Sequence, residues 1–371
     1  MTTPASASTL SKTQTLKQRP LIAPIPPLLQ SYLDNLNHVL KPYFIAQGFT
    51  ATPINAREAL AMLTFTYVTQ APNMAKTLDT YSLTPQPLKG GRQGYNVPLR
   101  VFVPEGMALP NIENPPDVPV MIYFHGGGGM AGSVSVYDKI YKKLAHASGC
   151  LVIAPEYRLA PENLYPAGID DAHNVLHNLT PMLTHIGYRC DGQCVIAGDS
   201  AGGAITATLV QDWLAGKVTS EIAITKQILI YASLDYTLTP PPHAKNTEKY
   251  QHASLTENAT GYLLETPKIH WYFDNYFTLY DDRELASPYW TDLQRLAHHT
   301  PLPLPATLNI TAGYCPLRDE DIGYHEQLLQ SGFNSDWLHF SDMVHTFINL
   351  ENLCLEACQT LYQKVGEFVK E

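Results

Sequence analysis

The sequence predicts an α/β fold, in which a mostly parallel central sheet carries helices on both faces and a helical cap. Short apolar runs rich in β-branched residues recur from about residue 97, and most of them are bounded by Gly, Pro, Asn or Asp. Strands are expected at VPLRVFV, VPVMIYF, LVIAP, CVIAG, QILIYA, ATLNITA and DWLHF. Helix-length segments separate them, at about 135–147, 168–180, 200–215, 319–331 and 351–369.

Two regions fall outside this alternation and are expected to form the cap. Residues 1–90 read as a tail and cap helices, helical or irregular throughout, and residues 236–290 begin with a proline turn and continue with an aromatic-rich segment. Residues 91–235 and 291–371 then supply the two parts of the α/β core. Ligands of parallel sheets bind beyond the carboxyl ends of the strands, so a lid is expected there.

Composition narrows the class of protein. The chain has 371 residues, 45% of them hydrophobic, and a net charge of −10 without a long Lys/Arg run, so a nucleic-acid partner is not expected. No apolar stretch reaches membrane-spanning length, and the polar first 20 residues do not resemble a secretory signal. Six sparse cysteines, none with zinc-ribbon spacing, predict reduced thiols in a cytoplasmic protein without a metal site. Exposed edge strands in such sheets favour a homodimer.

The stretch GDSAGG at residues 198–203 is the strongest candidate for a catalytic loop. It follows the expected strand CVIAG and precedes the helical pattern ITATLVQDWL. A sharp turn from strand to helix forces Ser200 into a strained conformation, and Gly198 and Gly202 remove the Cβ clashes that such a turn would produce. The sequence therefore predicts that Ser200 is a nucleophile at a helix N-terminus.

A second glycine loop, HGGGG at residues 125–129, follows the expected strand VPVMIYF. It can be a flexible turn, or its backbone N–H groups can bind an oxyanion. Its position before a GxSxG loop favours the second interpretation, with Gly126 and Gly127 as donors and the N–H of Ala201 as a third.

An alternative interpretation of the same loop is a dinucleotide site. Residues 127–132 match GxGxxG after a strand, and Glu156 ends the next strand at about the position of a ribose-binding acid. This interpretation is disfavoured because it explains neither GDSAGG nor the histidine described next.

His345 is the best-placed base for Ser200 among the 14 histidines of the chain. It lies in DMVHTF after the last expected strand, where the order serine, acid, histidine puts the base. His173 and His177 are four residues apart on an expected helix, but no glutamate follows the first of them as in HExxH, so a solvated helix face is expected.

Several spaced motifs resemble the hormone-sensitive-lipase-like esterases, the GDXG group (bacterial family IV) of the α/β-hydrolase superfamily. The resemblance covers about residues 95–371 and rests on HGGG at 125–128, YRLAPE at 157–162, YPAG at 165–168, GDSAGG at 198–203, PLRDE at 316–320 and the His345 loop.

This resemblance implies an α/β-hydrolase fold and a serine carboxylesterase that acts on short- or medium-chain acyl esters without a cofactor. By position, Ser200 would be the nucleophile and His345 the general base. The oxyanion hole would be formed by Gly126, Gly127 and Ala201. Asp199 would be the variable residue of the serine loop and not a catalyst.

Cys315 is the main departure from this family, because it occupies the position of the catalytic acid directly before PLRDE. Three interpretations stay open. A nearby carboxylate can substitute, Asp319 ahead of Glu320 and Asp321, although acids also stabilise the first turn of a helix. Cys315 itself can partner His345. The site can also have lost hydrolysis, which would leave a ligand-binding protein of the same fold.

Overall fold

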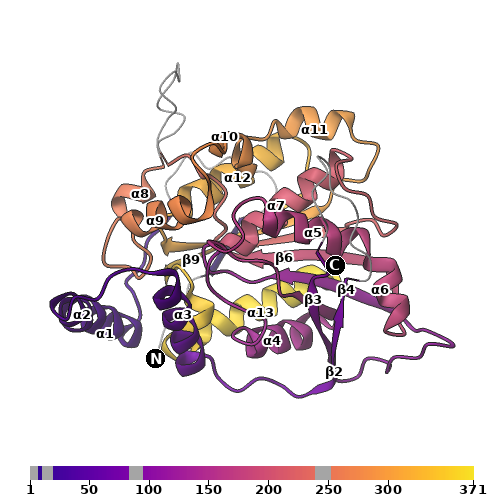
Figure 1. Cartoon of the computed structure of the whole chain (residues 1–371), viewed down its shortest axis with the longest axis horizontal. Coiled ribbons are helices and arrows are strands. Elements are labelled where there is room, and N and C mark those ends of the chain that lie inside the picture. The colour runs from indigo at the N-terminus through magenta and orange to yellow at the C-terminus, as the bar shows by residue number, and fades with distance from the viewer. Residues whose placement is uncertain (1–6, 11–19, 83–94, 239–251) are drawn as a thin grey trace.

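The computed structural model describes residues 7–10, 20–82, 95–238 and 252–371, and its centre is a nine-stranded sheet (Figure 1). The strand order is β1-β9-β8-β7-β6-β4-β5-β3-β2. The neighbours from β9 through β5 are parallel, whereas β1, β3 and β2 join as antiparallel strands at the two edges. The strands are β1 (Ala7–Leu10), β2 (Met74–Tyr81), β3 (Pro98–Pro104), β4 (Asp117–Phe124), β5 (Leu151–Pro155), β6 (Arg189–Asp199), β7 (Lys226–Ile230), β8 (Ala306–Tyr314) and β9 (Ser335–Val344).

Helices cover both faces of this sheet and bury it in two apolar cores. One core holds side chains of α4 (Asp138–Ser148) and α13 (Leu355–Lys370). The other core holds side chains of α5, α6, α7 and α12, on the opposite side of the sheet (Figure 1). These helices are α5 (Ala167–His177), α6 (Leu179–His185), α7 (Ala201–Leu214) and α12 (Arg318–Gln330). All five residues of β5 are buried, as expected of a strand covered on both sides.

The cap combines N-terminal helices with the segment between β7 and β8. It contains α1 (Pro27–Asn35), α2 (Lys41–Ala46), α3 (Pro53–Tyr67), α8 (Ser254–Glu257), α9 (Thr266–Tyr276) and α10 (Arg283–Ala286), whereas α11 (Leu293–His299) packs against the core helices α7 and α12. The two parts meet where Asn37 donates to the Gly261 carbonyl over 2.8 Å and where Lys41 pairs with Glu265 at 2.7 Å. α3, α8 and α9 lie near the end of the sheet where the parallel strands finish (Figure 1). Part of the expected proline turn and cap insertion, residues 239–251, lies outside the described residues.

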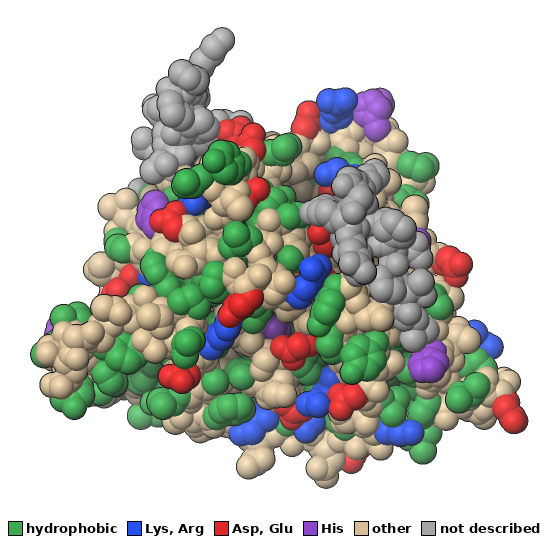
Figure 2. Space-filling model, in the orientation of Figure 1, with side chains coloured by type: hydrophobic (Ala, Val, Ile, Leu, Met, Phe, Trp, Pro, Cys, Tyr) green, Lys and Arg blue, Asp and Glu red, His purple; other side chains and the backbone are tan. Residues whose placement is uncertain are grey.

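The surface agrees with the expected charge pattern. Figure 2 shows acidic and basic side chains interspersed over the visible face, while hydrophobic side chains gather over α1 and α2 at its left edge. In the described part of the chain, no helix has the length and apolarity needed to span a membrane.

The expected strands and helices of the core are confirmed, with three corrections. β1 lies inside residues 1–90, which were expected to be helical or irregular throughout, and so does β2. The β2 sequence MAKTLDTY is mostly exposed because it is an edge strand paired only with β3, so it lacks a clear apolar pattern. The helix expected at 168–180 is two helices, α5 and α6. The last helix begins at Leu355, because residues 347–353 form a 3₁₀ helix.

Candidate active site

Ser200 lies in the sharp turn between β6 and α7. Its φ of 54° and ψ of −121° are unusual for a residue with a side chain, a strain of about 1–3 kcal/mol that the surrounding contacts must hold. The Ser200 N–H donates to the Ile230 carbonyl over 2.9 Å. A Cβ at Gly198 would collide with the Gly202 backbone, and one at Gly202 with the Phe124 carbonyl, so the tight turn requires both glycines.

The turn brings Ser200 to His345, which directly follows β9. Ser200 Oγ lies 2.9 Å from His345 Nε2, within hydrogen-bond distance of a nucleophile and its base. The two residues are only 8% and 4% exposed. Burial lowers the pKa of His345 to about 3, because the charged imidazolium loses its hydration. His345 is therefore a neutral acceptor at neutral pH.

Cys315 lies beside the other ring nitrogen of His345. Its Sγ is 3.2 Å from Nδ1 of His345 and also accepts the N–H of Leu317 over 3.3 Å. Burial, followed by the neighbouring charge of Asp321, raises the pKa of the thiol well above its ordinary value, so Cys315 is a neutral thiol. With the proton of the neutral imidazole on Nδ1, donated to sulfur, Nε2 is free to accept from Ser200.

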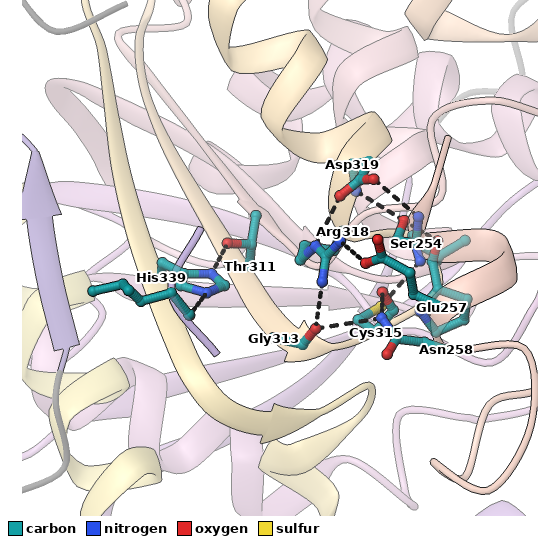
Figure 3. A network of polar contacts seen from close by, with 12 residues as sticks. Ser254, Glu257, Asn258, Thr311, Gly313, Cys315, Arg318, Asp319 and His339 are labelled. Carbon is teal, nitrogen blue, oxygen red and sulfur yellow. Dashed lines mark hydrogen bonds and ion pairs between the residues drawn. The ribbon is translucent and has the colours of Figure 1, made fainter. Parts of the chain in front are cut away.

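Asp319, the expected substitute acid, binds Arg318 and Ser254 and not His345; its contacts with these two residues are drawn in Figure 3. Its carboxylate accepts the N–H of Ser254 over 2.9 Å and pairs with Arg318 at 2.8 Å. Arg318 also binds Glu257 of α8 at 2.7 Å. The carboxylate therefore anchors the cap to the start of α12, a correction to its expected role.

The other two acids of this stretch also bind elsewhere. Glu320 accepts the N–H of Leu234 over 2.7 Å, and Asp321 accepts a backbone hydrogen bond from Ala232. Burial raises the pKa of both carboxyl groups well above their ordinary values. Both acids hold the chain that follows β7, and among the described residues no carboxylate forms a hydrogen bond with His345.

The glycine loop departs from expectation at its first glycine. The N–H of Gly126 donates to Asp199 Oδ1 over 2.9 Å, so this N–H is not free to bind an oxyanion. Gly126 is therefore corrected from an oxyanion donor to a residue that fixes the loop. The N–H groups of Gly127 and Gly128 have no acceptor among the described residues, and Ala201 is the first residue of α7, where helical N–H groups are free. Gly128 is thus a donor candidate that the sequence interpretation missed.

Asp199, expected to be a variable residue without a catalytic part, holds the glycine loop against the serine turn. It accepts the hydroxyls of Tyr123 at 2.9 Å and Tyr137 at 3.1 Å in addition to the Gly126 N–H. Burial raises its pKa to about 6, and these three hydrogen bonds oppose that rise. An acid at the end of the buried run CVIAG signals such a cluster, because a buried carboxyl group needs several donors.

The cap packs directly on the same loop. A Cβ at Gly128 would enter the ring of Tyr272, and one at Gly129 would meet the ring of Tyr276. Both tyrosines belong to α9, so this helix packs on the loop. Only glycine fits beneath it, with φ of +65° and +70° at these two positions.

The alternative sites proposed from sequence do not assemble. Glu156, the acid considered for binding a ribose, instead accepts the backbone N–H of Val134 over 2.9 Å. His173 pairs with Asp212 at 2.9 Å, whereas His177 contacts Thr219. No group of three or more potential metal ligands occurs within the described ranges.

Comparisons with known proteins identify the fold family of the chain. The family described as the alpha/beta hydrolase fold matches residues 121–349, more than half of the chain. The chain therefore belongs to the α/β-hydrolase fold family, and the expected fold class is confirmed.

Similar proteins carry ester-hydrolase names. Ethyl acetate hydrolase of Pseudomonas putida is 28% identical over 74% of this chain and 78% of its own length. Carboxylesterase NlhH of Mycobacterium tuberculosis is 29% identical over 68% and 72%. The structure of a hyperthermophilic esterase from Pyrobaculum calidifontis is 25% identical, covers 94% of this chain and 98% of its own, and has a TM-score of 0.73. These matches support the resemblance to the hormone-sensitive-lipase-like esterases and the expected enzyme class.

Proposed function

We propose that the chain is a serine carboxylesterase that hydrolyses short- to medium-chain acyl esters through an acyl-enzyme, with Cys315 orienting the general base. The proposal rests on two contacts of one imidazole ring. Ser200 Oγ lies 2.9 Å from His345 Nε2, and Cys315 Sγ lies 3.2 Å from His345 Nδ1. They place a nucleophile, a base and a group that orients the base in the required order.

In the acylation step, Ser200 Oγ adds to the ester carbonyl while its proton moves to His345 Nε2. The negative charge that develops on the carbonyl oxygen is stabilised by the N–H groups of Gly127, Gly128 and Ala201. A donor of this kind typically contributes about 10²- to 10³-fold to kcat. Collapse of the intermediate breaks the C–O bond, His345 gives its proton to the oxygen of the leaving alcohol, and the acyl group stays on Ser200.

In the deacylation step, His345 takes a proton from water, which adds to the acyl-serine carbonyl. Collapse then returns that proton to Ser200 Oγ and releases the carboxylic acid. Neither the acylation step nor the deacylation step described here requires a metal or an organic cofactor. A relative named ethyl acetate hydrolase supports the proposed substrate class.

Covalent labelling tests the nucleophile directly. The unmodified chain is incubated with a fluorophosphonate and its mass and labelled peptide are determined. We expect one equivalent of label on Ser200 and none in Ser200→Ala. Ser148→Ala is the matched control, because Ser148 is buried in α4 and bonds to the Leu144 carbonyl, so it should keep the label. An unlabelled Ser200, with equal ester turnover by the unmodified chain and Ser200→Ala, would contradict the proposal and favour a ligand-binding protein.

A further inference from the structure

We infer that the site selects esters whose leaving group departs as a stable anion, namely aryl esters, enol esters and thioesters, over simple alkyl esters. The inference rests on the proposed function, because it requires Ser200 as nucleophile and His345 as base. It deepens that function by naming the part of the substrate to which the site is most sensitive.

A positive charge forms on His345 during attack. When Ser200 transfers its proton, the buried ring becomes an imidazolium whose Nδ1–H points at a sulfur atom 3.2 Å away. A neutral thiol is only a weak hydrogen-bond acceptor and carries no charge to balance the imidazolium. In serine proteases with a Ser-His-Asp triad, loss of the acid lowers kcat by about 10⁴-fold.

Among the residues that the structure describes, no other acid bonds to His345 in place of the missing carboxylate. The carboxylate of Asp319 is held by Ser254 and Arg318, and that of Glu320 by the Leu234 N–H. Asp321 is bonded to the backbone of Ala232, and it makes no hydrogen bond to either ring nitrogen of His345. The imidazolium is therefore formed without a carboxylate bonded to it, and a transition state is disfavoured in proportion to the charge on His345.

The leaving group of the ester determines how much charge His345 carries in the transition state. An alkyl ester must reach the full tetrahedral intermediate, with complete proton transfer to His345, before its poor leaving group departs with that proton. An activated ester has a more electrophilic carbonyl, and attack limits its rate, so its transition state comes earlier with less charge on the ring. The C–O or C–S bond then breaks to release a phenolate, enolate or thiolate, and His345 returns its proton to that anion or to water. The missing carboxylate thus slows alkyl esters more than activated esters.

The same reasoning applies to deacylation, because Ser200 is itself an alkyl alcohol. The acyl-enzyme must therefore break down through the fully charged His345, whatever the first leaving group was. With an activated ester, acylation is fast and deacylation is slow. We expect the acyl-enzyme to accumulate and the phenol to be released in a burst of one equivalent per site.

A leaving-group series tests the inference. kcat/KM is measured for p-nitrophenyl, phenyl, trifluoroethyl and ethyl butyrate with the unmodified chain and with Cys315→Asp, which places a carboxylate beside Nδ1. We expect Cys315→Asp to raise the ethyl ester rate by about 10²-fold or more and the p-nitrophenyl rate by less than about tenfold, within the range set by loss of the acid. Cys315→Ser is the matched control, since it replaces the thiol by an uncharged hydroxyl and should keep the steep dependence of the rate on the leaving group.

The outcomes separate the inference from the proposed function. Equal gains for ethyl and p-nitrophenyl esters in a Cys315→Asp protein that still titrates with fluorophosphonate at Ser200 would overturn the inference alone. So would a linear release of p-nitrophenol without a burst from the unmodified chain. Equal turnover by the unmodified chain and Ser200→Ala would overturn the proposed function, and the inference with it.

Discussion

Cys315 Sγ lies 3.2 Å from Nδ1 of His345, while Ser200 Oγ lies 2.9 Å from Nε2 of the same ring. The imidazole is thus held between an alcohol and a thiol, both largely shielded from water. The tautomer that donates to sulfur is the one that can accept from Ser200, so the thiol can set the direction of the base although it cannot balance its charge.

The pH dependence of turnover should reveal this uncharged partner. A protonated His345 cannot accept the serine proton, so activity is lost as the pH falls through its pKa, which burial lowers to about 3. We expect kcat/KM for a soluble ester to hold its plateau below pH 5. Cys315→Asp should move the acid limb upward, because a carboxylate stabilises the imidazolium. An acid limb near pH 6.5 in the unmodified chain would contradict this account.

Asp199 should be essential for turnover although it touches no reacting atom. Asp199→Ala leaves the N–H of Gly126 and two tyrosine hydroxyls without their acceptor, so the oxyanion loop loses its anchor. We expect kcat to fall by about 10²-fold or more with a smaller change in KM. Asp212→Ala is the control, because Asp212 is also a buried acid but lies near the far end of α7, where it pairs with His173 and Lys217. A similar loss of kcat in both variants would indicate general destabilisation instead.

Asp199 should also make stability depend on pH. Burial raises its pKa to about 6 in the folded chain, above the ordinary value of 3.8, so the folded state binds this proton more tightly than the unfolded state. The resulting stabilisation is complete below about pH 4 and is lost as the pH rises through about 6, a change of about 3 kcal/mol. Urea unfolding of the unmodified chain and Asp199→Asn between pH 4 and 7 measures it. An identical slope in both proteins would contradict the assignment.

Arg318 should hold the cap to the core. It binds Glu257 and Asp319, donates to the Gly313 carbonyl over 3.0 Å, and is almost fully buried (Figure 3). We expect Arg318→Gln to lower the free energy of unfolding by about 2 kcal/mol or more, since the Arg318 side chain is only 4% exposed and its pairs with Glu257 and Asp319 would be lost. Arg189→Gln, which removes the exposed pair with Asp117, should change it by less than about 1 kcal/mol. Equal losses in urea unfolding would argue against this anchoring.

Asp319→Asn tests whether Asp319 only anchors the cap or also acts as the catalytic acid. The amide oxygen can still accept from Ser254, and the carboxylate does not reach His345, so we expect kcat/KM to stay within about threefold, as for changes outside the reacting groups. The acid limb of the pH profile should also stay in place. A loss of about 10³-fold or more would show that Asp319 acts on the histidine after all.

The sequence predicted the parts of the site that depend on local geometry. Gly198 and Gly202 mark the serine turn because their Cβ positions are blocked by nearby backbone, and His345 is placed by the end of β9. Partners distant in the sequence were missed. Asp319 binds Ser254 of the cap, and the Gly126 N–H binds Asp199 from another strand, contacts that only the assembled fold determines. β2 was missed because an exposed edge strand carries little apolar periodicity.

Hydrolysis of p-nitrophenyl butyrate by the unmodified chain, with Ser200→Ala as the blank, tests the central claim most directly. The account predicts a burst of p-nitrophenol equal to the enzyme concentration, then slower steady turnover far above that of the Ser200→Ala protein. Turnover equal to the blank, with acetate and octanoate esters as well, would show that a serine and histidine oriented by Cys315 do not form a working esterase.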